Sequence, residues 1–187
     1  MSTISDVRAS HETKMKKTID VLRADLASLR AGRATPALLE KVMVEYYGTP
    51  TPVTQVANVS VPEPRMIVIQ PWEKGLMKDI EKAIMKSDLG LMPSNDGVVI
   101  RLSIPQMTEQ RRQELVKVVH KKAEECRVAV RNIRRDANDV IKKMEKDKVV
   151  SEDEAKKAQD DIQKLTDKII KDVDQIMASK EKEIMEV

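Results

Sequence analysis

The chain has 187 residues, of which 41% are hydrophobic and 35% are charged, and its formal net charge is +3. That length can bury the core of one large domain or of two small ones. Aromatic residues make up only 2% of the chain, which argues against recognition of nucleic-acid bases on a platform of aromatic rings.

Residues 4–29 are predicted to form the first helix. Mainly apolar residues recur there at spacings of three and four, as on one face of a helix. They are Ile4, Val7, His11, Met15, Ile19, Leu22, Leu26 and Leu29. Gly32 and Pro36 follow, and both are typical of the end of a helix. The start of the chain resembles neither a secretion signal nor a transit peptide, so we expect a cytoplasmic protein.

Residues 33–105 are predicted to form a small inserted α+β domain. Seven of the eight prolines lie between Pro36 and Pro93, and here the apolar period changes from helical to alternating. The expected elements are a strand at 42–46, a turn at 48–52, a strand at 66–70, a helix at 76–84 and a strand at 98–104. Two chain crossings, at 32–36 and 103–107, would join this β/α/β domain to the helices.

Residues 108–144 carry the strongest helical pattern. Two sets of small or apolar residues each repeat every seven positions, as in a coiled coil. They are Val116, Ala123, Val130, Ala137 and Met144, together with Val119, Cys126, Ile133 and Val140. With Thr108 as N-cap the predicted helix would have 36–38 residues and a length of roughly 55 Å.

A third long helix is predicted to begin after Ser151. The run Ser151-Glu152-Asp153-Glu154 is typical of a capping box, and an apolar stripe follows it. The stripe is Ala155, Ala158, Ile162, Leu165, Ile169, Val173 and Ile176. A short turn near 147–150 would place the last two helices antiparallel. Residues 1–31 and 108–187 are therefore expected to form an antiparallel three-helix bundle.

The positive charge lies on the first and second helical stretches, and residues 1–35 carry seven basic and four acidic residues, a balance of +3. Residues 108–150 carry thirteen basic and eight acidic residues, a balance of +5, whereas 151–187 carry seven and eleven, a balance of −4. Four arginines, Arg127, Arg131, Arg134 and Arg135, cover about 100° of the helix beside the apolar seam, and Lys117 and His120 extend this stripe. A solvated face paired with Glu124, Asp136 and Asp139 is the simpler alternative. The choice of arginine favours phosphate contacts with RNA or another polyanion.

The sequence offers little support for catalysis. It contains neither a phosphate-binding loop nor a dinucleotide-binding glycine motif. His11-Glu12 begins a zinc motif that Met15 interrupts, so His11 is expected in the core. Cys126 is expected to be a buried and slowly reacting thiol, and as the only cysteine it cannot form an internal disulfide.

Four blocks of sequence resemble the ribosome recycling factor family. They are residues 29–36 (LRAGRATP), 44–52 (VEYYGTPTP), 80–91 (IEKAIMKSDLGL) and 127–138 (RVAVRNIRRDAN). The resemblance covers nearly the whole chain, and the blocks occur in the family's order. It implies an L-shaped molecule of a three-helix bundle and a β/α/β domain. It further implies a factor that binds the post-termination ribosome and, with the GTPase elongation factor G, splits it into subunits.

The resemblance also implies roles for particular residues. Arg131, Arg134 and Arg135 correspond to basic residues that contact large-subunit rRNA, and with them we group Arg30, Arg33, Lys117 and Arg127. The expected hinge consists of Gly32, Ala34, Thr35, Pro36, Ser103, Ile104 and Pro105. We expect a monomer that needs no cofactor or metal and does not enter a membrane.

Two other classes of function remain open from sequence alone. A coiled-coil adaptor would use the heptads to bind partner helices, but it would need apolar surface left over from the bundle. An enzyme could hold a site in the inserted domain around Arg65 or Trp72, although no acid–base or metal pattern supports one. A more general RNA-binding helical protein is a further alternative.

Overall fold

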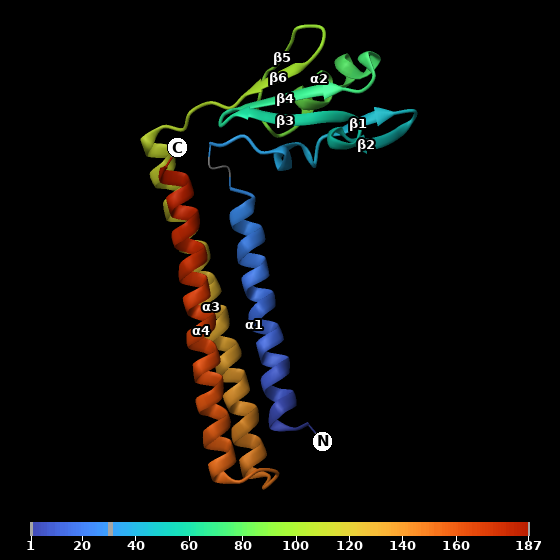
Figure 1. Cartoon of the computed structure of the whole chain (residues 1–187). Helices are drawn as coiled ribbons and strands as arrows, with labels where there is room; N and C mark the ends of the chain where they lie inside the picture. The colour runs from blue at the N-terminus through green and yellow to red at the C-terminus, as the bar shows by residue number, and fades with distance from the viewer. Residues whose placement is uncertain (1, 30–31, 187) are drawn as a thin grey trace. The chain divides into compact units, whose positions relative to one another are not determined.

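We describe residues 2–29 and 32–186 of the chain in a computed structural model. The chain divides into two compact units, one of residues 1–30 and 109–186 and the other of residues 31–108. The first is a bundle of long helices, and the second is a small domain of strands and short helices (Figure 1).

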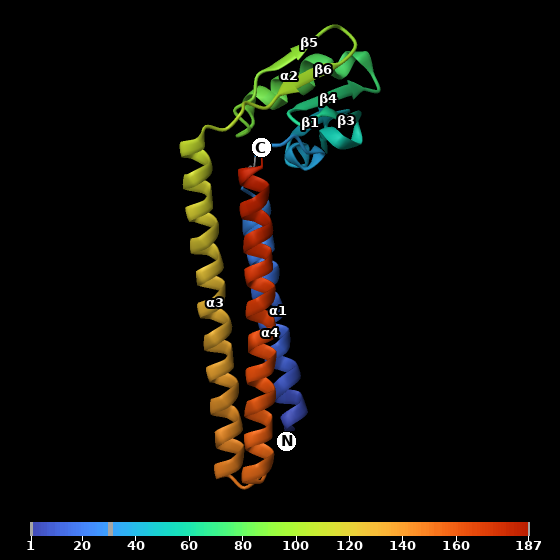
Figure 2. The same cartoon turned by 60° about the vertical axis from the view of Figure 1, so that its left-hand side comes forward.

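The bundle consists of α1 (Ile4–Ala27), α3 (Glu109–Lys146) and α4 (Glu152–Met185). They run side by side, with α3 antiparallel to the other two (Figures 1 and 2). The predicted length of the middle helix is confirmed, because α3 has 38 residues. The predicted capping box of α4 is also confirmed: Glu154 N–H donates to the Ser151 hydroxyl, and Ser151 N–H donates to the Glu154 carboxylate. Thr3 and Asp6 cap α1 in the same way.

Buried positions in the bundle recur seven residues apart, as predicted at Val119 and Cys126, and also eleven residues apart. In α3 the buried residues include Leu115, Cys126 and Ala137 in one row and Val119, Val130 and Ile141 in another. In α1, His11 and Met15 are followed eleven positions later by Leu22 and Leu26, and in α4 the row is Ile162, Val173 and Ile184. Eleven residues in three turns give about 3.67 per turn, close to the 3.6 of a straight helix.

One member of the predicted heptads, Val140, is wrong. Val140 is 40% exposed, and Ile141 takes the core position beside it. Val116, Ile133 and Met144 are only partly buried. A strict seven-residue repeat drifts by about 20° per heptad from a straight helix, so part of such a pattern turns away from the core, as it does at Val140.

The small unit contains two antiparallel sheets. The first pairs β1 (Met43–Tyr46) with β2 (Thr49–Pro52). The second has the order β3-β4-β6-β5, formed by β3 (Ala57–Glu63), β4 (Met66–Pro71), β5 (Pro93–Asn95) and β6 (Ile100–Ser103). The helix α2 (Met77–Lys86) follows β4, and the described residues of the unit also form the short 3-10 helices η1 (Pro36–Leu39), η2 (Val53–Gln55) and η3 (Lys74–Leu76).

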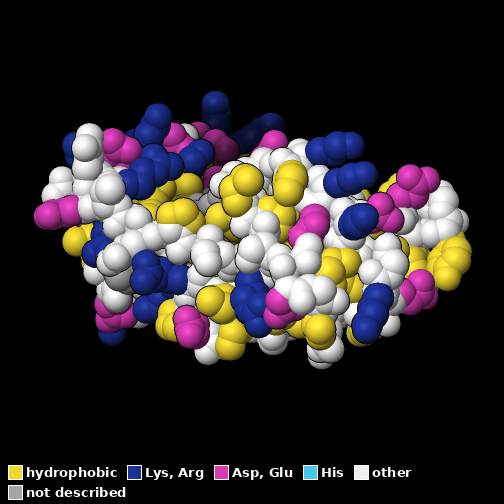
Figure 3. All heavy atoms as spheres, turned by 90° about the horizontal axis from the view of Figure 1, so that it is seen from above, with side chains coloured by type: hydrophobic (Ala, Val, Ile, Leu, Met, Phe, Trp, Pro, Cys, Tyr) yellow, Lys and Arg dark blue, Asp and Glu magenta, His cyan; other side chains and the backbone are white. Residues whose placement is uncertain are grey.

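The core of the small unit lies between α2 and the sheets. Ile80 and Ile84 of α2 are fully buried in one cluster with Ile67, Ile69 and Leu102 of the strands. On the face seen in Figure 3, hydrophobic side chains are interspersed with acidic and basic ones. The predicted α+β class is confirmed, and three strands were not predicted from the sequence: β2, β3 and β5. Each contains proline, which argues against a strand but is tolerated at a sheet edge or bulge.

The linker segments are partly held by the small unit itself. Ala34 N–H donates to the Pro64 carbonyl at 2.8 Å, and Ile104 N–H donates to the Arg65 carbonyl at 2.8 Å. Both expected hinge strands are thus fastened to the same β3–β4 turn. Ser103 pairs with Met66 as part of β6, and Pro36 begins η1. Thr35 is the N-cap of η1, and its carbonyl accepts from Leu38 N–H at 3.2 Å. Gly32 and Pro105 lie outside these backbone pairs and elements, and Gly32 has a positive φ of 73°.

Candidate nucleic-acid interface on α3

The basic residues of α3 fall into two rows, which the structure separates by what they contact. The inner row consists of His120, Arg127 and Arg134, which lie seven positions apart and all reach α4. The outer row consists of Lys117, Arg131 and Arg135. At 100° per residue, Lys117 and Arg135 share one angular position, some 80–100° from Arg127 and Arg134 around the helix.

Arg127 is the most firmly held member of the inner row. Its Nε and Nη2 donate to Asp174 Oδ1 at 2.9 and 2.6 Å, and its Nη1 donates to Glu124 Oε2 at 3.1 Å. Only 16% of its side chain is exposed. Burial alone would lower the pKa of the guanidinium, but the hydrogen bonds to Asp174 and Glu124 raise it on balance. Arg127 therefore joins α3 to α4.

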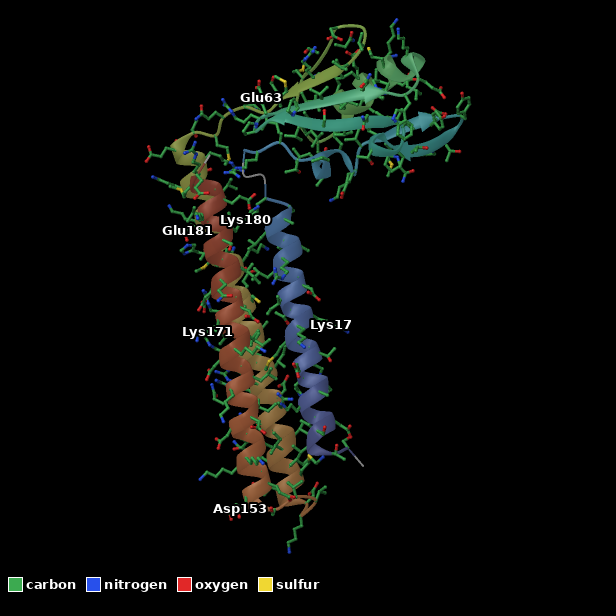
Figure 4. The ribbon with its side chains drawn as sticks, in the orientation of Figure 1. Lys17, Glu63, Asp153, Lys171, Lys180 and Glu181 are labelled. Atoms are coloured by element: carbon green, nitrogen blue, oxygen red, sulfur yellow. The ribbon has the colours of Figure 1, made fainter. Side chains whose placement is uncertain are left out.

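The other inner-row contacts repeat this pattern at both ends. His120 Nε2 lies 3.0 Å from Glu181 Oε2, and Arg134 Nη1 donates to Gln163 Oε1 at 3.3 Å. Because Gln163 is neutral, this hydrogen bond does not pair Arg134 with a negative charge. Figure 4 shows Glu181 and its neighbour Lys180 leaving α4 on different sides. Lys180 reaches the other partner helix, where its Nζ donates to the Leu29 carbonyl at 3.2 Å beyond the end of α1.

The outer row is turned away from the core. Lys117 and Arg135 are exposed, and within residues 2–29 and 32–186 neither has an ion pair. Arg131 is 41% exposed, and its Nη1 lies 3.5 Å from Glu124 Oε1. Among the acidic residues that could neutralise these basic side chains, Glu124 pairs with Arg131. Asp136 and Asp139 form no ion pair with the described part of the chain.

The remaining expected RNA contacts lie outside α3. Arg33 is exposed in the first linker. Arg30 lies outside the described residues. The structure thus brings Lys117, Arg131 and Arg135 together on one face of α3, with Arg134 beside them.

The residues that hold the inner row could not be named from the sequence. Asp174, Gln163 and Glu181 belong to α4, and pairing them with α3 requires the register of the helical hairpin. That register depends on the turn after Lys146, where Lys148 has a positive φ of 57° and Val149 N–H donates to the Met144 carbonyl at 2.9 Å. The sequence did contain one sign of these contacts with α4, which is the seven-residue spacing of His120, Arg127 and Arg134.

The two buried residues with reactive side chains belong to the bundle core, as expected. His11 is buried, and its Nδ1 lies 2.7 Å from the Val7 carbonyl. Cys126 is 5% exposed, and its Sγ lies 3.7 Å from the Thr18 carbonyl. Burial raises the pKa of the Cys126 thiol, although the nearby Arg127 charge opposes this. Both side chains therefore belong to the packed core of the bundle.

The surroundings of an enzyme site are not found in the described residues. They contain no group of three histidine, cysteine or acidic side chains that could hold a metal ion. Arg65 and Trp72 are both exposed. A cavity of about 460 Å³ between α1 and α4 holds one carboxylate, Glu183, and this group pairs with Lys180 at 3.4 Å. No helix in the described part of the chain is long and apolar enough to cross a membrane.

The apolar surface that a helix-binding adaptor would need is also not found among the described residues of the bundle. The apolar stripes of α1, α3 and α4 are buried among one another. The exposed large apolar residues of the bundle stand singly around the helices: Val21, Val118, Val128, Val140, Val149 and Met185. Such scattered residues are normal on a soluble surface and do not form an interface.

These features define a class of protein: a two-unit binding protein whose long helical bundle presents a basic face. Comparison with known proteins makes the assignment specific. The family model described as "Ribosome recycling factor" matches residues 22–185. The chain belongs to the ribosome recycling factor family, whose members are translation factors rather than enzymes.

Relatives match over nearly their whole length. The ribosome-recycling factor of Syntrophomonas wolfei is 66% identical over 184 residues, which is 98% of this chain and all of that protein. That of Symbiobacterium thermophilum is 68% identical over 176 residues, covering 94% of this chain and 95% of that one.

Solved structures of ribosome recycling factors are also similar to this chain. A solution structure of a ribosome recycling factor is 45% identical with a TM-score of 0.79 and covers both chains fully. A second structure is 49% identical with a TM-score of 0.64 and covers 98% of this chain and all of that one. It shows models for the T. thermophilus ribosome recycling factor and the E. coli elongation factor G bound to the E. coli post-termination complex.

Proposed function

We propose that this chain binds the post-termination ribosome and, together with elongation factor G, splits it into subunits for reuse. The chain would act in the cytoplasm as a monomer. Family membership carries the general function, and the solved relative on the post-termination complex supports the choice of partners. The GTPase supplies the free energy, in keeping with the lack of a phosphate-binding loop in this sequence.

The outer row of α3 is the proposed contact with ribosomal RNA. The observation that carries it is the orientation of Arg135 and Lys117, which face away from the core and have no ion pair within the described residues. Arg131 and Arg134 flank them with only partial hydrogen bonding. Arginine offers paired N–H donors that fit phosphate oxygens, so this face suits an RNA backbone without any contact to bases. Arg33 would add a contact from the linker, as Arg30 would by resemblance.

Ribosome binding at several salt concentrations tests this contact. Arg135→Ala should weaken binding about three- to tenfold and flatten its salt dependence, because one phosphate contact fewer releases fewer counterions. The control is Arg23→Ala, which removes the same charge from the exposed surface of α1. Equal losses from both variants would show that overall charge, and not the outer row, determines affinity.

Subunit splitting tests the function as a whole. Purified ribosomes carrying a terminated message are mixed with this chain, elongation factor G and GTP, and light scattering reports their dissociation. We expect dissociation only when all components are present. Dissociation without this chain, or none with it, would contradict the proposed function.

The small unit is proposed to move about the linkers during splitting. Because Ala34 and Ile104 are fastened to the β3–β4 turn, rotation would be concentrated at 32–33 and 105–107. A cross-link between the two units, made in a Cys126→Ala background, should leave ribosome binding intact and abolish splitting. Full splitting by a cross-linked protein would show that the movement is not required.

A further inference from the structure

Glu124 lies on the face of α3 that carries the outer row, and its side chain contacts one arginine of each row. Its two carboxylate oxygens reach different arginines: Oε2 lies 3.1 Å from Arg127 Nη1, and Oε1 lies 3.5 Å from Arg131 Nη1. The side chain is 57% exposed, so neither contact is enforced by burial. One acidic residue thus links a structural arginine to an arginine of the proposed RNA contact.

The inner arginine does not depend on this carboxylate. Arg127 already has two hydrogen bonds with Asp174 of α4, at 2.6 and 2.9 Å. Those bonds use its Nε and Nη2, whereas Glu124 meets only Nη1. Removing the charge of Glu124 would therefore leave the link between α3 and α4 in place. An exposed ion pair within one helix contributes little to stability.

The outer arginine is affected much more. Glu124 is the carboxylate that pairs with Arg131 among the described residues, so it neutralises part of the charge that a phosphate would meet. A phosphate that approaches Arg131 must displace Glu124, and the displaced carboxylate stays on the same face of the helix and repels it. Both effects weaken binding to RNA.

We propose that Glu124 is an intramolecular competitor of RNA phosphate for Arg131 and limits the affinity of the outer row. This inference rests on the proposed function, in which Arg131 contacts ribosomal RNA. A factor that acts repeatedly has to leave the ribosome after each round. A carboxylate poised to take back Arg131 speeds that departure without loosening the bundle.

The test compares two single substitutions that remove the same charge. Glu124→Gln keeps the size of the side chain but cannot neutralise Arg131. Glu125→Gln is the matched control, because Glu125 is the next residue, is 56% exposed and contacts Lys122 at 3.8 Å instead. Affinity for purified ribosomes and the rate of dissociation from them are measured for both variants at one moderate salt concentration.

We expect Glu124→Gln to bind about twofold to fivefold more tightly and to dissociate more slowly, as the loss of one exposed charge pair implies. Glu125→Gln should change affinity clearly less. The gain should also vanish in an Arg131→Ala background, since the competitor then has nothing to compete for. Equal gains from both glutamine variants, or a gain that persists without Arg131, would overturn the proposal.

Two further outcomes distinguish a failure of this inference from a failure of the proposed RNA contact. If Arg131→Ala alone leaves ribosome binding unchanged, Arg131 is not an RNA contact, and both this inference and that part of the proposed function fail. If Arg131→Ala weakens binding but Glu124→Gln does not strengthen it, the inference alone fails. The thermal unfolding midpoint of Glu124→Gln should stay near that of the unaltered protein, and a marked fall would show that Glu124 is structural instead.

Discussion

The side of α3 turned into the bundle and the side turned outward carry the same kinds of basic residue but place them in different surroundings. Arg127 is largely buried and bonded to Asp174, whereas Arg135 is exposed and has no ion pair within residues 2–29 and 32–186. The two residues lie only eight positions apart. Residue type and sequence proximity therefore do not determine a role, because the direction of each side chain around the helix decides which groups it meets. The inward side should control stability, and the outward side should control binding.

The largest effect on the inward side is expected at Cys126. Cys126→Asp places a carboxylate where the thiol is 5% exposed, and it should lower the free energy of unfolding by about 3–5 kcal/mol. Urea unfolding measures this, with Cys126→Ala as the control for loss of volume alone. A loss no greater than that of the alanine variant would mean that this position opens to solvent.

A smaller loss is expected from the inner row itself. Arg127→Ala removes the hydrogen bonds to Asp174 and the packing of a side chain that is only 16% exposed. We expect the free energy of unfolding to fall by about 1–2 kcal/mol, because both the ion pairs and the aliphatic stem are lost. Asp174→Asn should reproduce much of this loss. If it has no effect while Arg127→Ala does, packing rather than charge holds the two helices.

On the outward side, Lys117→Ala should scarcely change stability and should weaken ribosome binding modestly, by about twofold to threefold. Lys117 shares the angular position of Arg135 but lies eighteen residues away along α3. The double variant Lys117→Ala/Arg135→Ala should therefore show additive losses of binding free energy. Strong non-additivity would mean that the RNA does not follow the helix between them.

The smallest effect is a dependence of stability on alkaline pH. Burial raises the pKa of the Cys126 thiol in the folded state, so the folded chain keeps this proton at a pH where the unfolded chain releases it. The stability contributed by the neutral thiol is complete below the unfolded pKa of about 8.5 and is lost as pH rises above it. Between pH 8 and 10, unaltered protein should thus lose stability faster than Cys126→Ala. Parallel profiles would contradict the burial of the thiol.

Part of this division could be predicted from the sequence. The long helix after Thr108, the capping box at Ser151 and the burial of Cys126 follow from local patterns that no distant contact overrides. The small unit was predicted less completely. β3 contains Pro62 and has an irregular register between Ser60 and Glu63. The alternation of apolar and polar residues by which a strand is predicted from sequence is therefore interrupted there.

The two rows of α3 could not be separated from the sequence. All four arginines lie within about 100° of the helix surface, so their spacing alone does not show which of them border the core. Asp174 is 47 positions from Arg127, so their contact depends on the register of the hairpin. Local spacing indicated a basic face, but the partners on α4 decide which arginines remain available to RNA.

A crossed comparison of Arg127→Ala and Arg135→Ala tests the division most directly. Each variant is measured for urea unfolding and for affinity to purified ribosomes. We predict that Arg127→Ala lowers stability by about 1–2 kcal/mol with less than about a twofold change in the affinity of the folded protein. Arg135→Ala should change stability by less than about 0.5 kcal/mol and weaken binding about three- to tenfold. If both variants lose affinity to the same extent, or if Arg135→Ala is the destabilising one, the division of α3 into a structural row and a binding row is wrong.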